Sequence, residues 1–207
     1  MKTVYFVRHG ESEGNAGNKF QSAVEKLTEV GIQQAEYVAK RFASIPIDVI
    51  LASTMLRAYH TAQKIAELTN KKLVVNDVLV EVSRPTSLHG QTKNDPEIEA
   101  IDAELMRKFG NAEWKHSDEE NFYDLQKRAQ KAIAMILERP EENICVVTHG
   151  FFLRMMFAEM MFGADLTPVT FLHMNRVMKT FNTGITKIRH EKNMWILLAW
   201  NDHAHLG

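Results

Sequence analysis

Cysteine is almost absent from this chain of 207 residues, in which Cys145 is the one cysteine. A single thiol excludes an intramolecular disulfide framework and is typical of a reducing compartment, so we expect a cytoplasmic protein. Long apolar runs are also missing, because residues 151–164 are too few to span a bilayer and include Arg154 and Glu159. Residues 1–15 lack the basic-then-apolar layout of a signal peptide.

The chain has no strong excess of charge, since its formal net charge is -1 at pH 7. We therefore expect neither a nucleic-acid partner nor an anionic membrane surface. Repeats, low-complexity tracts and linker-like segments are absent as well. An apolar content of 45% and a charged content of 25% are typical of a globular protein, and we expect one domain over residues 1–207.

The hydrophobic pattern alternates between two periods. Short apolar runs bounded by polar turns predict buried strands at 3–7, 48–52 and 143–147, an edge strand at 72–75 and a hairpin built from 183–190 and 194–200. Helical spacing of apolar residues predicts helices over 28–42, 55–68, 96–109 and 122–137, and helices that begin near 151 and 167. The sequence therefore predicts an α/β three-layer sandwich, with a mostly parallel central sheet and helices on both faces.

Positively charged and titratable side chains follow three of these strands. Arg8 and His9 end the first strand, Arg57 lies just after the second, and His149 and Gly150 follow the third. Ligands of parallel α/β sheets bind at the carboxyl ends of the strands, beside helix N-termini. We therefore expect these residues to meet at one edge of the sheet, although they are far apart in the chain.

Two arginines and two histidines at one sheet edge predict a phosphate site. Guanidinium groups bind phosphate oxygens with two parallel hydrogen bonds. Neighbouring cations lower the pKa of a histidine and keep its ring neutral, which preserves a nitrogen nucleophile. The backbone N–H groups after Gly150, at a helix N-terminus, are expected to point at the same anion.

Phosphoryl transfer to or from an alcohol also needs a group that handles a proton. Glu81, in VLVEVSRP, is the best candidate because it follows the predicted edge strand and precedes a loop with a proline. Glu11 is a rival, since it lies two residues after His9.

Taken together, these segments resemble the histidine phosphatase superfamily and its phosphoglycerate mutase-like fold. RHGESEGN resembles the opening signature of the family, KLTEVGIQQA and ASTMLRAYHTAQKI resemble its next two segments, and VVTHG, FNTGITKI and NDHAHL resemble later ones. VEV places Glu81 where that family keeps its acid. The resemblance covers nearly the whole chain in order.

The resemblance implies a mechanism and a role for each matching residue. His9 would attack phosphorus and carry a phosphohistidine. Arg8, Arg57 and His149 would hold the phosphoryl oxygens, with further contacts from Asn15 and Gly150. Glu81 would protonate the leaving group and then deprotonate water. Neither a metal nor a cofactor is implied.

Several functions stay open at this point. The leading hypothesis is a phosphomonoesterase that acts on a small phosphorylated metabolite. A mutase of the phosphoglycerate type, a binding module without catalysis, and a metal-dependent hydrolase with His9 and His149 as ligands are alternatives. We expect residues 83–121 to form a cap over the site, and their acidic composition argues against a substrate with several anionic groups.

Several other residues of chemically reactive or metal-binding types are not expected to form a functional site. His203 and His205 lie beside Asp202, but two ligands at that spacing do not predict a metal site. Cys145 is read as a small core residue. Four methionines, Met155, Met156, Met160 and Met161, are expected to fill the core, with a homodimer face as the alternative.

Overall fold

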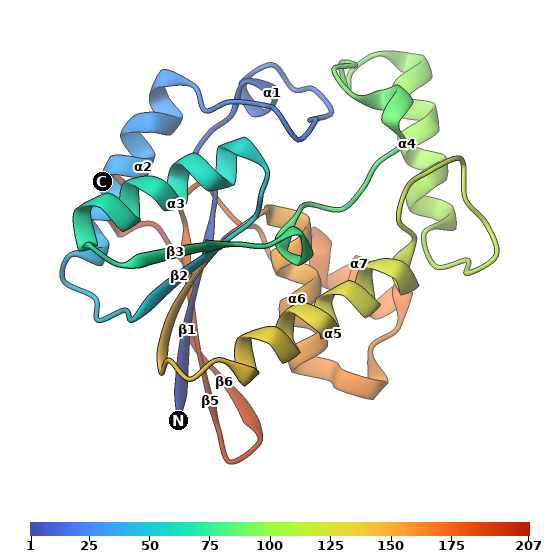
Figure 1. The fold of residues 1–207 in the computed structure, drawn as a ribbon. Helices are drawn as coiled ribbons and strands as arrows, with labels where there is room; N and C mark the ends of the chain where they lie inside the picture. The colour runs from blue at the N-terminus through green and yellow to red at the C-terminus, as the bar shows by residue number, and fades with distance from the viewer.

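The computed structural model describes residues 1–207, and its centre is one six-stranded sheet (Figure 1). The strands lie in the order β3-β2-β4-β1-β5-β6. Their bounds are β1 Lys2–Arg8, β2 Val49–Ala52, β3 Lys72–Val75, β4 Asn143–Thr148, β5 Ile185–Glu191 and β6 Met194–Asp202. All six strands predicted from the sequence are present.

The first four strands are parallel, because β2 pairs in parallel with β3 and β4, and β4 with β1. β5 runs antiparallel to β1, and β6 antiparallel to β5. The mostly parallel sheet and the C-terminal hairpin are thus confirmed. The hairpin turn is formed by Lys192 and Asn193, which both have a positive φ, as a two-residue turn requires. β5 therefore extends through Glu191, one residue beyond the predicted segment 183–190.

Seven α-helices connect or follow the strands: α1 Glu13–Ala16, α2 Glu29–Phe42, α3 Leu56–Thr69, α4 Pro96–Lys108, α5 Phe122–Glu138, α6 Gly150–Phe162 and α7 Pro168–Val177. Short 3-10 helices lie at Asp77–Leu79, Thr86–Leu88, Gly163–Asp165 and Ala204–Leu206. Thr28 caps α2, with its side chain accepting the N–H of Gly31. The sequence did not predict α1, a single turn too short for periodicity to reveal.

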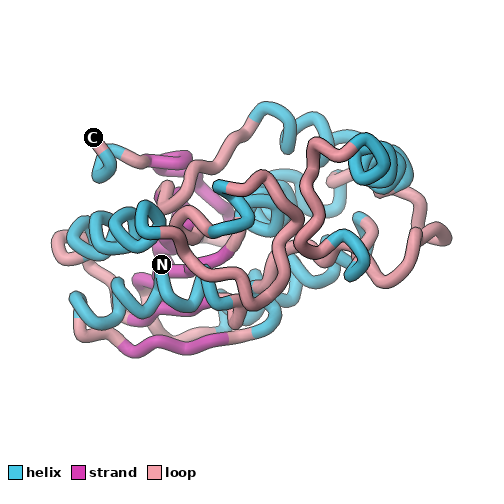
Figure 2. Tube along the Cα trace, turned by 90° about the horizontal axis from the view of Figure 1, so that it is seen from above, coloured by secondary structure: helices cyan, strands magenta, loops and turns pink.

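Helices cover both faces of the sheet (Figure 2). Because side chains alternate along a strand, Tyr5 and Val7 face α2 and α3, whereas Val4 and Phe6 face α5 and α6. The first face has a core cluster of 14 buried residues, and the second face has one of 23. The predicted three-layer sandwich is therefore the observed fold.

α6 is the most apolar helix, and most of it lies in the larger core cluster. Met155 and Met156 are buried and Met160 packs against that cluster, as predicted for core methionines, whereas Met161 is 49% exposed. None of the helices combines the length and the apolar content that are needed to cross a membrane.

The segment 83–121 lies apart from these layers. Its main helix, α4, stands beyond the end of the sheet (Figure 1). Leu88 and Leu105 of this segment form a small separate cluster with Phe20 from the loop after α1. The segment therefore packs against the loop that follows α1.

Candidate active site

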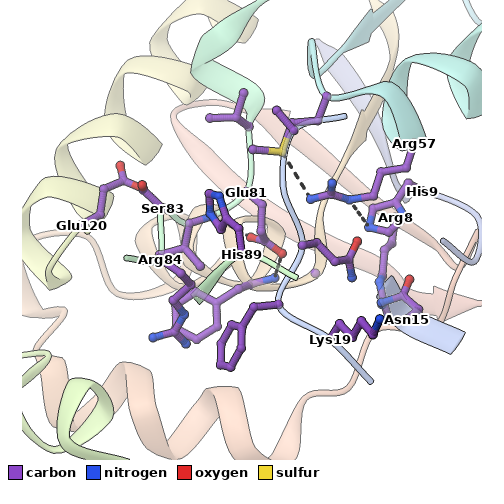
Figure 3. Close-up of a pocket in the computed structure, with 18 of the residues that line it drawn as sticks. Arg8, His9, Asn15, Lys19, Arg57, Glu81, Ser83, Arg84, His89 and Glu120 are labelled. Carbon is purple, nitrogen blue, oxygen red and sulfur yellow. Dashed lines mark hydrogen bonds between the residues drawn. The ribbon is translucent and has the colours of Figure 1, made fainter. Parts of the chain in front are cut away.

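A cavity of about 680 Å³ opens at the carboxyl ends of the central strands. β2, β4 and β1 are adjacent there, and Arg8 lies opposite Thr148 in the register. The cavity wall includes six residues that the sequence predicts for the site: Arg8, His9, Asn15, Arg57, Glu81 and Gly150 (Figure 3). The structure therefore brings together residues from four distant segments of the chain.

His9 is held as a neutral ring with a defined tautomer. Its Nδ1 lies 2.7 Å from the carbonyl oxygen of Gly10, which can only accept, so Nδ1 carries the proton. Nε2 therefore keeps its lone pair, and the Nε of Arg57 donates to it at 3.3 Å. Burial, then Arg57 and Arg8, hold the pKa of His9 well below its usual value. An unprotonated nitrogen thus faces Arg57 at the cavity.

The two arginines keep their positive charges without a carboxylate partner. Arg57 donates to His9, to the carbonyl of Ser22 at 2.8 Å and to the sulfur of Met55 at 3.3 Å, all of them neutral groups. Burial lowers the pKa of Arg57 to about 10, so the side chain stays charged at neutral pH. Arg8 donates Nη1 to the carbonyl of Thr180 at 2.7 Å, and its Nε is buried without a partner. Both guanidinium groups retain hydrogen-bonding capacity for an anion.

His149 lies behind the cavity wall. Its ring centroid is 5.1 Å from that of His9, and the residue is 0% exposed. Its Nε2 is hydrogen-bonded to the hydroxyl of Ser53 at 2.8 Å, whereas Nδ1 is buried without a partner. Desolvation, followed by Arg57, lowers the pKa of His149 well below its usual value. The serine was not predicted as a site residue, although its place directly after β2 could have indicated it.

Glu81 is bound to the N-terminus of α6. Its carboxylate accepts the N–H groups of Phe151 at 3.1 Å and Phe152 at 2.9 Å. The expectation that the amides after Gly150 bind the ligand anion is therefore wrong for these two amides. A carboxylate from the protein occupies the positive end of the helix instead.

Glu11, the rival acid, points elsewhere. Its carboxylate accepts a hydrogen bond from the hydroxyl of Thr28 at 2.8 Å, at the start of α2, and it is not part of the cavity wall. Asn15 does face the cavity, and its Oδ1 accepts from the side chain of Asn182 at 3.3 Å. Asn182 also donates to the carbonyl of His9 at 2.8 Å, a contact between chain ends that sequence patterns do not reveal.

Sequence reasoning missed most of the outer wall of the cavity, which also contains Lys19, Arg84, His89, Lys93, Arg128 and Arg154. Arg154 had a detectable signal, since it interrupts an apolar helix one turn after Gly150. Arg128 holds the backbone at Glu81 in place, because it donates to the carbonyls of Val80 at 2.7 Å and Glu81 at 3.1 Å.

The acidic composition of residues 83–121 does not describe the face turned to the cavity. Of its many acids, Asp102 and Glu120 reach the wall, and each pairs with an arginine, Arg84 and Arg128 respectively. Within the cavity wall this segment contributes as many cations, Arg84 and Lys93, as carboxylates, so its overall composition does not argue against a substrate with several anionic groups. Net composition does not reveal which side chains of this segment point toward the cavity.

The structure contains no group of three or more His, Cys, Asp or Glu side chains placed to hold a metal ion. Near the C-terminus, His203 directs Nδ1 to the carbonyl of Asn201 at 2.9 Å, and His205 contacts the hydroxyl of Thr183 at 3.1 Å. Cys145 is buried in β4, and burial raises the pKa of its thiol.

Comparisons with known proteins identify the family of this chain. A sequence model described as the histidine phosphatase superfamily (branch 1) matches residues 4–203. Phosphoserine phosphatase from Entamoeba histolytica is 26% identical over 100% of both chains, and crystal structures with phosphoserine and with 3-phosphoglyceric acid give TM-scores of 0.80 and 0.78. The Bacillus stearothermophilus protein YhfR is 26% identical over 100% of both chains with a TM-score of 0.85. A mycobacterial glucosyl-3-phosphoglycerate phosphatase shares the fold, at 23% identity over 97% of this chain and 99% of its own, with a TM-score of 0.80.

Proposed function

The chain belongs to the histidine phosphatase superfamily, and from that premise we propose that it is a phosphomonoesterase that acts on a small phosphorylated metabolite through a phosphohistidine. One observation carries the proposal: an unprotonated Nε2 of His9 faces a cavity that also contains Arg8, Arg57 and Glu81. Nucleophile, anion binders and a proton-transfer group are thus in one place.

In the first step, Nε2 of His9 attacks phosphorus and a P–N bond forms while the P–O bond to the leaving group breaks. Arg8, Arg57, Asn15 and the backbone at Gly150 bind the phosphoryl oxygens, where negative charge is concentrated in the transition state. We propose His149, whose Nδ1 forms no hydrogen bond within the protein, as a further ligand of the same oxygens. Glu81 gives its proton to the departing alcohol oxygen.

In the second step, Glu81 takes a proton from water, and the water oxygen attacks the phosphohistidine. The P–N bond breaks, phosphate leaves and His9 returns to its neutral form with Nδ1 still bonded to Gly10. The amides of Phe151 and Phe152 hold the Glu81 carboxyl group in place.

The arginines supply the positive charge at the phosphoryl group, and we therefore propose catalysis without a metal ion. We also propose a cytoplasmic location, supported by the free, buried thiol of Cys145, and a small phosphorylated substrate rather than a nucleic-acid or membrane partner. A homodimer remains a proposal that analytical ultracentrifugation tests directly.

Hydrolysis of p-nitrophenyl phosphate tests the central proposal. We expect turnover that vanadate inhibits, that EDTA leaves unchanged and that His9→Ala abolishes. Acid-labile, base-stable labelling of His9 by a ³²P-labelled substrate would identify the intermediate. Turnover that survives in His9→Ala would contradict the proposed nucleophile, and loss of turnover in EDTA would contradict metal independence.

A phosphoglycerate-type mutase is the second candidate, because the inner face of the cavity is basic and could hold a substrate with two anionic groups. Incubation with a phosphoglycerate isomer and its bisphosphate separates the two activities. Phosphate release faster than isomer exchange supports the phosphatase, and the reverse supports the mutase.

A further inference from the structure

The turn between α7 and β5, residues 178–184, contacts the site from outside the cavity. Its Asn182 donates Nδ2 to the carbonyl oxygen of His9 at 2.8 Å and to Oδ1 of Asn15 at 3.3 Å. Asn182 is not part of the cavity wall, whereas His9 and Asn15 are. One amide nitrogen therefore contacts the proposed nucleophile and a proposed phosphoryl ligand without reaching the substrate.

Two donors fix the direction of the Asn15 amide. Besides Asn182, the N–H of Ser12 donates to Oδ1 of Asn15 at 3.3 Å, within the capping box of α1. Because α1 is a single turn of four residues, its own hydrogen bonds hold this side chain weakly. Donors bind the oxygen of an amide, so the Nδ2 of Asn15 is the end that stays free in the cavity wall. It is the end that can donate to a phosphoryl oxygen.

The backbone next to Asn182 is anchored to the end of β1. The N–H of Thr183 donates to the carbonyl of Arg8 at 2.8 Å, and the hydroxyl of Thr183 donates to the carbonyl of Asn182 at 2.8 Å. Thr183 is completely buried and has a φ of 59°, which is costly for a β-branched residue. Such a conformation persists only where the surrounding contacts enforce it. The turn therefore presents the Asn182 amide in one fixed position.

The last strand and the C-terminal residues support the same turn. Oδ1 of Asn201, in β6, accepts the N–H of Phe181 at 2.8 Å, and a Cβ at Gly184 would lie 2.1 Å from that oxygen. Since the hydroxyl of Thr183 already donates its proton, it accepts from Nε2 of His205 at 3.1 Å. The turn is thus held between β1 on one side and the C-terminal segment on the other.

We propose that Asn182 is a positioning residue for the phosphorylation of His9. It holds the carbonyl of His9, in the peptide that leads to Gly10, whose own carbonyl fixes Nδ1 of the nucleophile. It also turns Nδ2 of Asn15 toward the phosphoryl group. The inference rests on the proposed phosphatase function and adds to that function a residue that does not touch the substrate.

Asn182→Leu tests the proposal, because leucine has a similar branched shape and no donor. The measurement is p-nitrophenol release in a single turnover with enzyme in saturating excess, which gives the rate constant for phosphorylation of His9. We expect this rate constant to fall about 10- to 100-fold, as for a slightly misplaced reacting group. The enzyme concentration that gives half of the maximal rate should change less.

A merely structural role would give another result. It would lower the melting temperature or the folded fraction, and a single-turnover rate constant at saturation does not depend on that fraction. Asn143→Leu is the matched control, since Asn143 lies at the other end of β4 and its side chain bonds to Asp48. Its rate constant should stay as in the wild type. An unchanged rate constant in Asn182→Leu would overturn the proposal.

A double-mutant cycle with Asn15→Ala locates the coupling. If Asn182 acts in part through Asn15, the two substitutions together slow phosphorylation by less than the product of their separate effects. A loss equal to that product would overturn the coupling to Asn15. A wild-type protein that releases no p-nitrophenol rejects the phosphatase function and this inference with it, whereas wild-type turnover that Asn182→Leu leaves unchanged rejects the positioning role alone.

Discussion

The hydroxyl of Thr61 joins the first strand to the helix that carries Arg57. It accepts the N–H of Gly10 at 3.0 Å and donates to the carbonyl of Arg57 at 2.7 Å, in a completely buried position. Gly10 in turn fixes the tautomer of His9. One hydroxyl therefore helps to align the nucleophile with its neighbouring cation.

Thr61→Val tests this link, because it keeps the shape and removes the hydroxyl. The N–H of Gly10 is then buried without an acceptor, so we expect a loss of about 1–3 kcal/mol in the free energy of unfolding and a lower kcat. Urea denaturation and p-nitrophenyl phosphate turnover measure the two effects. Thr69→Val, in the same helix, is the control, since its hydroxyl bonds only to the carbonyl of Ile65. Equal effects in both variants would contradict the proposed role.

Glu81 offers a second prediction at the residue scale. An alkyl leaving group needs a proton, whereas a 2,4-dinitrophenolate does not, so Glu81→Gln should slow phosphorylation of His9 by about 10²- to 10⁴-fold for alkyl phosphates and far less for the aryl ester. Rapid-quench bursts report this step separately from the later attack of water. Glu11→Gln should leave both rates unchanged, because Glu11 bonds to Thr28 outside the cavity. Equal losses for both esters in Glu81→Gln would reject the acid role.

At the scale of elements, the loop after β1 and the N-terminus of α2 approach each other backbone to backbone. A Cβ at Gly31 would lie 1.9 Å from the carbonyl oxygen of Glu11, and one at Gly10 would lie 2.5 Å from the carbonyl oxygen of Gly31. Real Cβ atoms do not approach so closely, so both positions require glycine for steric reasons. This contact holds the loop that contains His9 against the helix.

Gly31→Ala should therefore destabilise the protein although alanine favours helices. We expect a loss of about 1–3 kcal/mol in the free energy of unfolding, as for overpacking of a filled site, and a lower kcat because the loop of His9 moves. Gln33→Ala, two residues along α2 and exposed, is the control and should cost little. A stabilised Gly31→Ala protein would show that the loop yields without strain.

At the scale of the whole molecule, the fold buries two neutral histidines among cations. His9 and His149 have pKa values well below that of an unfolded chain. In the unfolded state a histidine has a pKa of about 6.5. Below that pH the unfolded chain binds protons at these two histidines, whereas the folded protein does not. The free energy of unfolding is therefore highest above pH 6.5 and falls as the pH is lowered.

We expect the free energy of unfolding to drop by about 1 kcal/mol for each of these two histidines between pH 7 and pH 5.5. Denaturation by urea in buffers free of phosphate and sulfate measures it, since such anions would bind the folded state. His9→Gln should remove about one histidine's share of the pH dependence. His116→Gln is the control, because His116 is exposed. An unchanged dependence in His9→Gln would contradict burial of a neutral ring.

Local sequence patterns are enough to predict the elements and the inner part of the site. Apolar runs of period two and of helical period, with caps such as Thr28, predict elements that depend on local propensity and on one buried face. Arg8, Arg57 and His149 were predictable at one edge because each follows a parallel strand, and parallel strands end on the same side of a sheet.

The tertiary fold sets which partner each polar group has. The amides of α6 bind Glu81 rather than the ligand, Ser53 holds His149, and Asn182 contacts His9 from the other end of the chain. It also turned Arg84 and Lys93 of an acidic segment inward. Such pairings depend on distances between elements that are remote in the chain, and no periodicity or composition contains those distances.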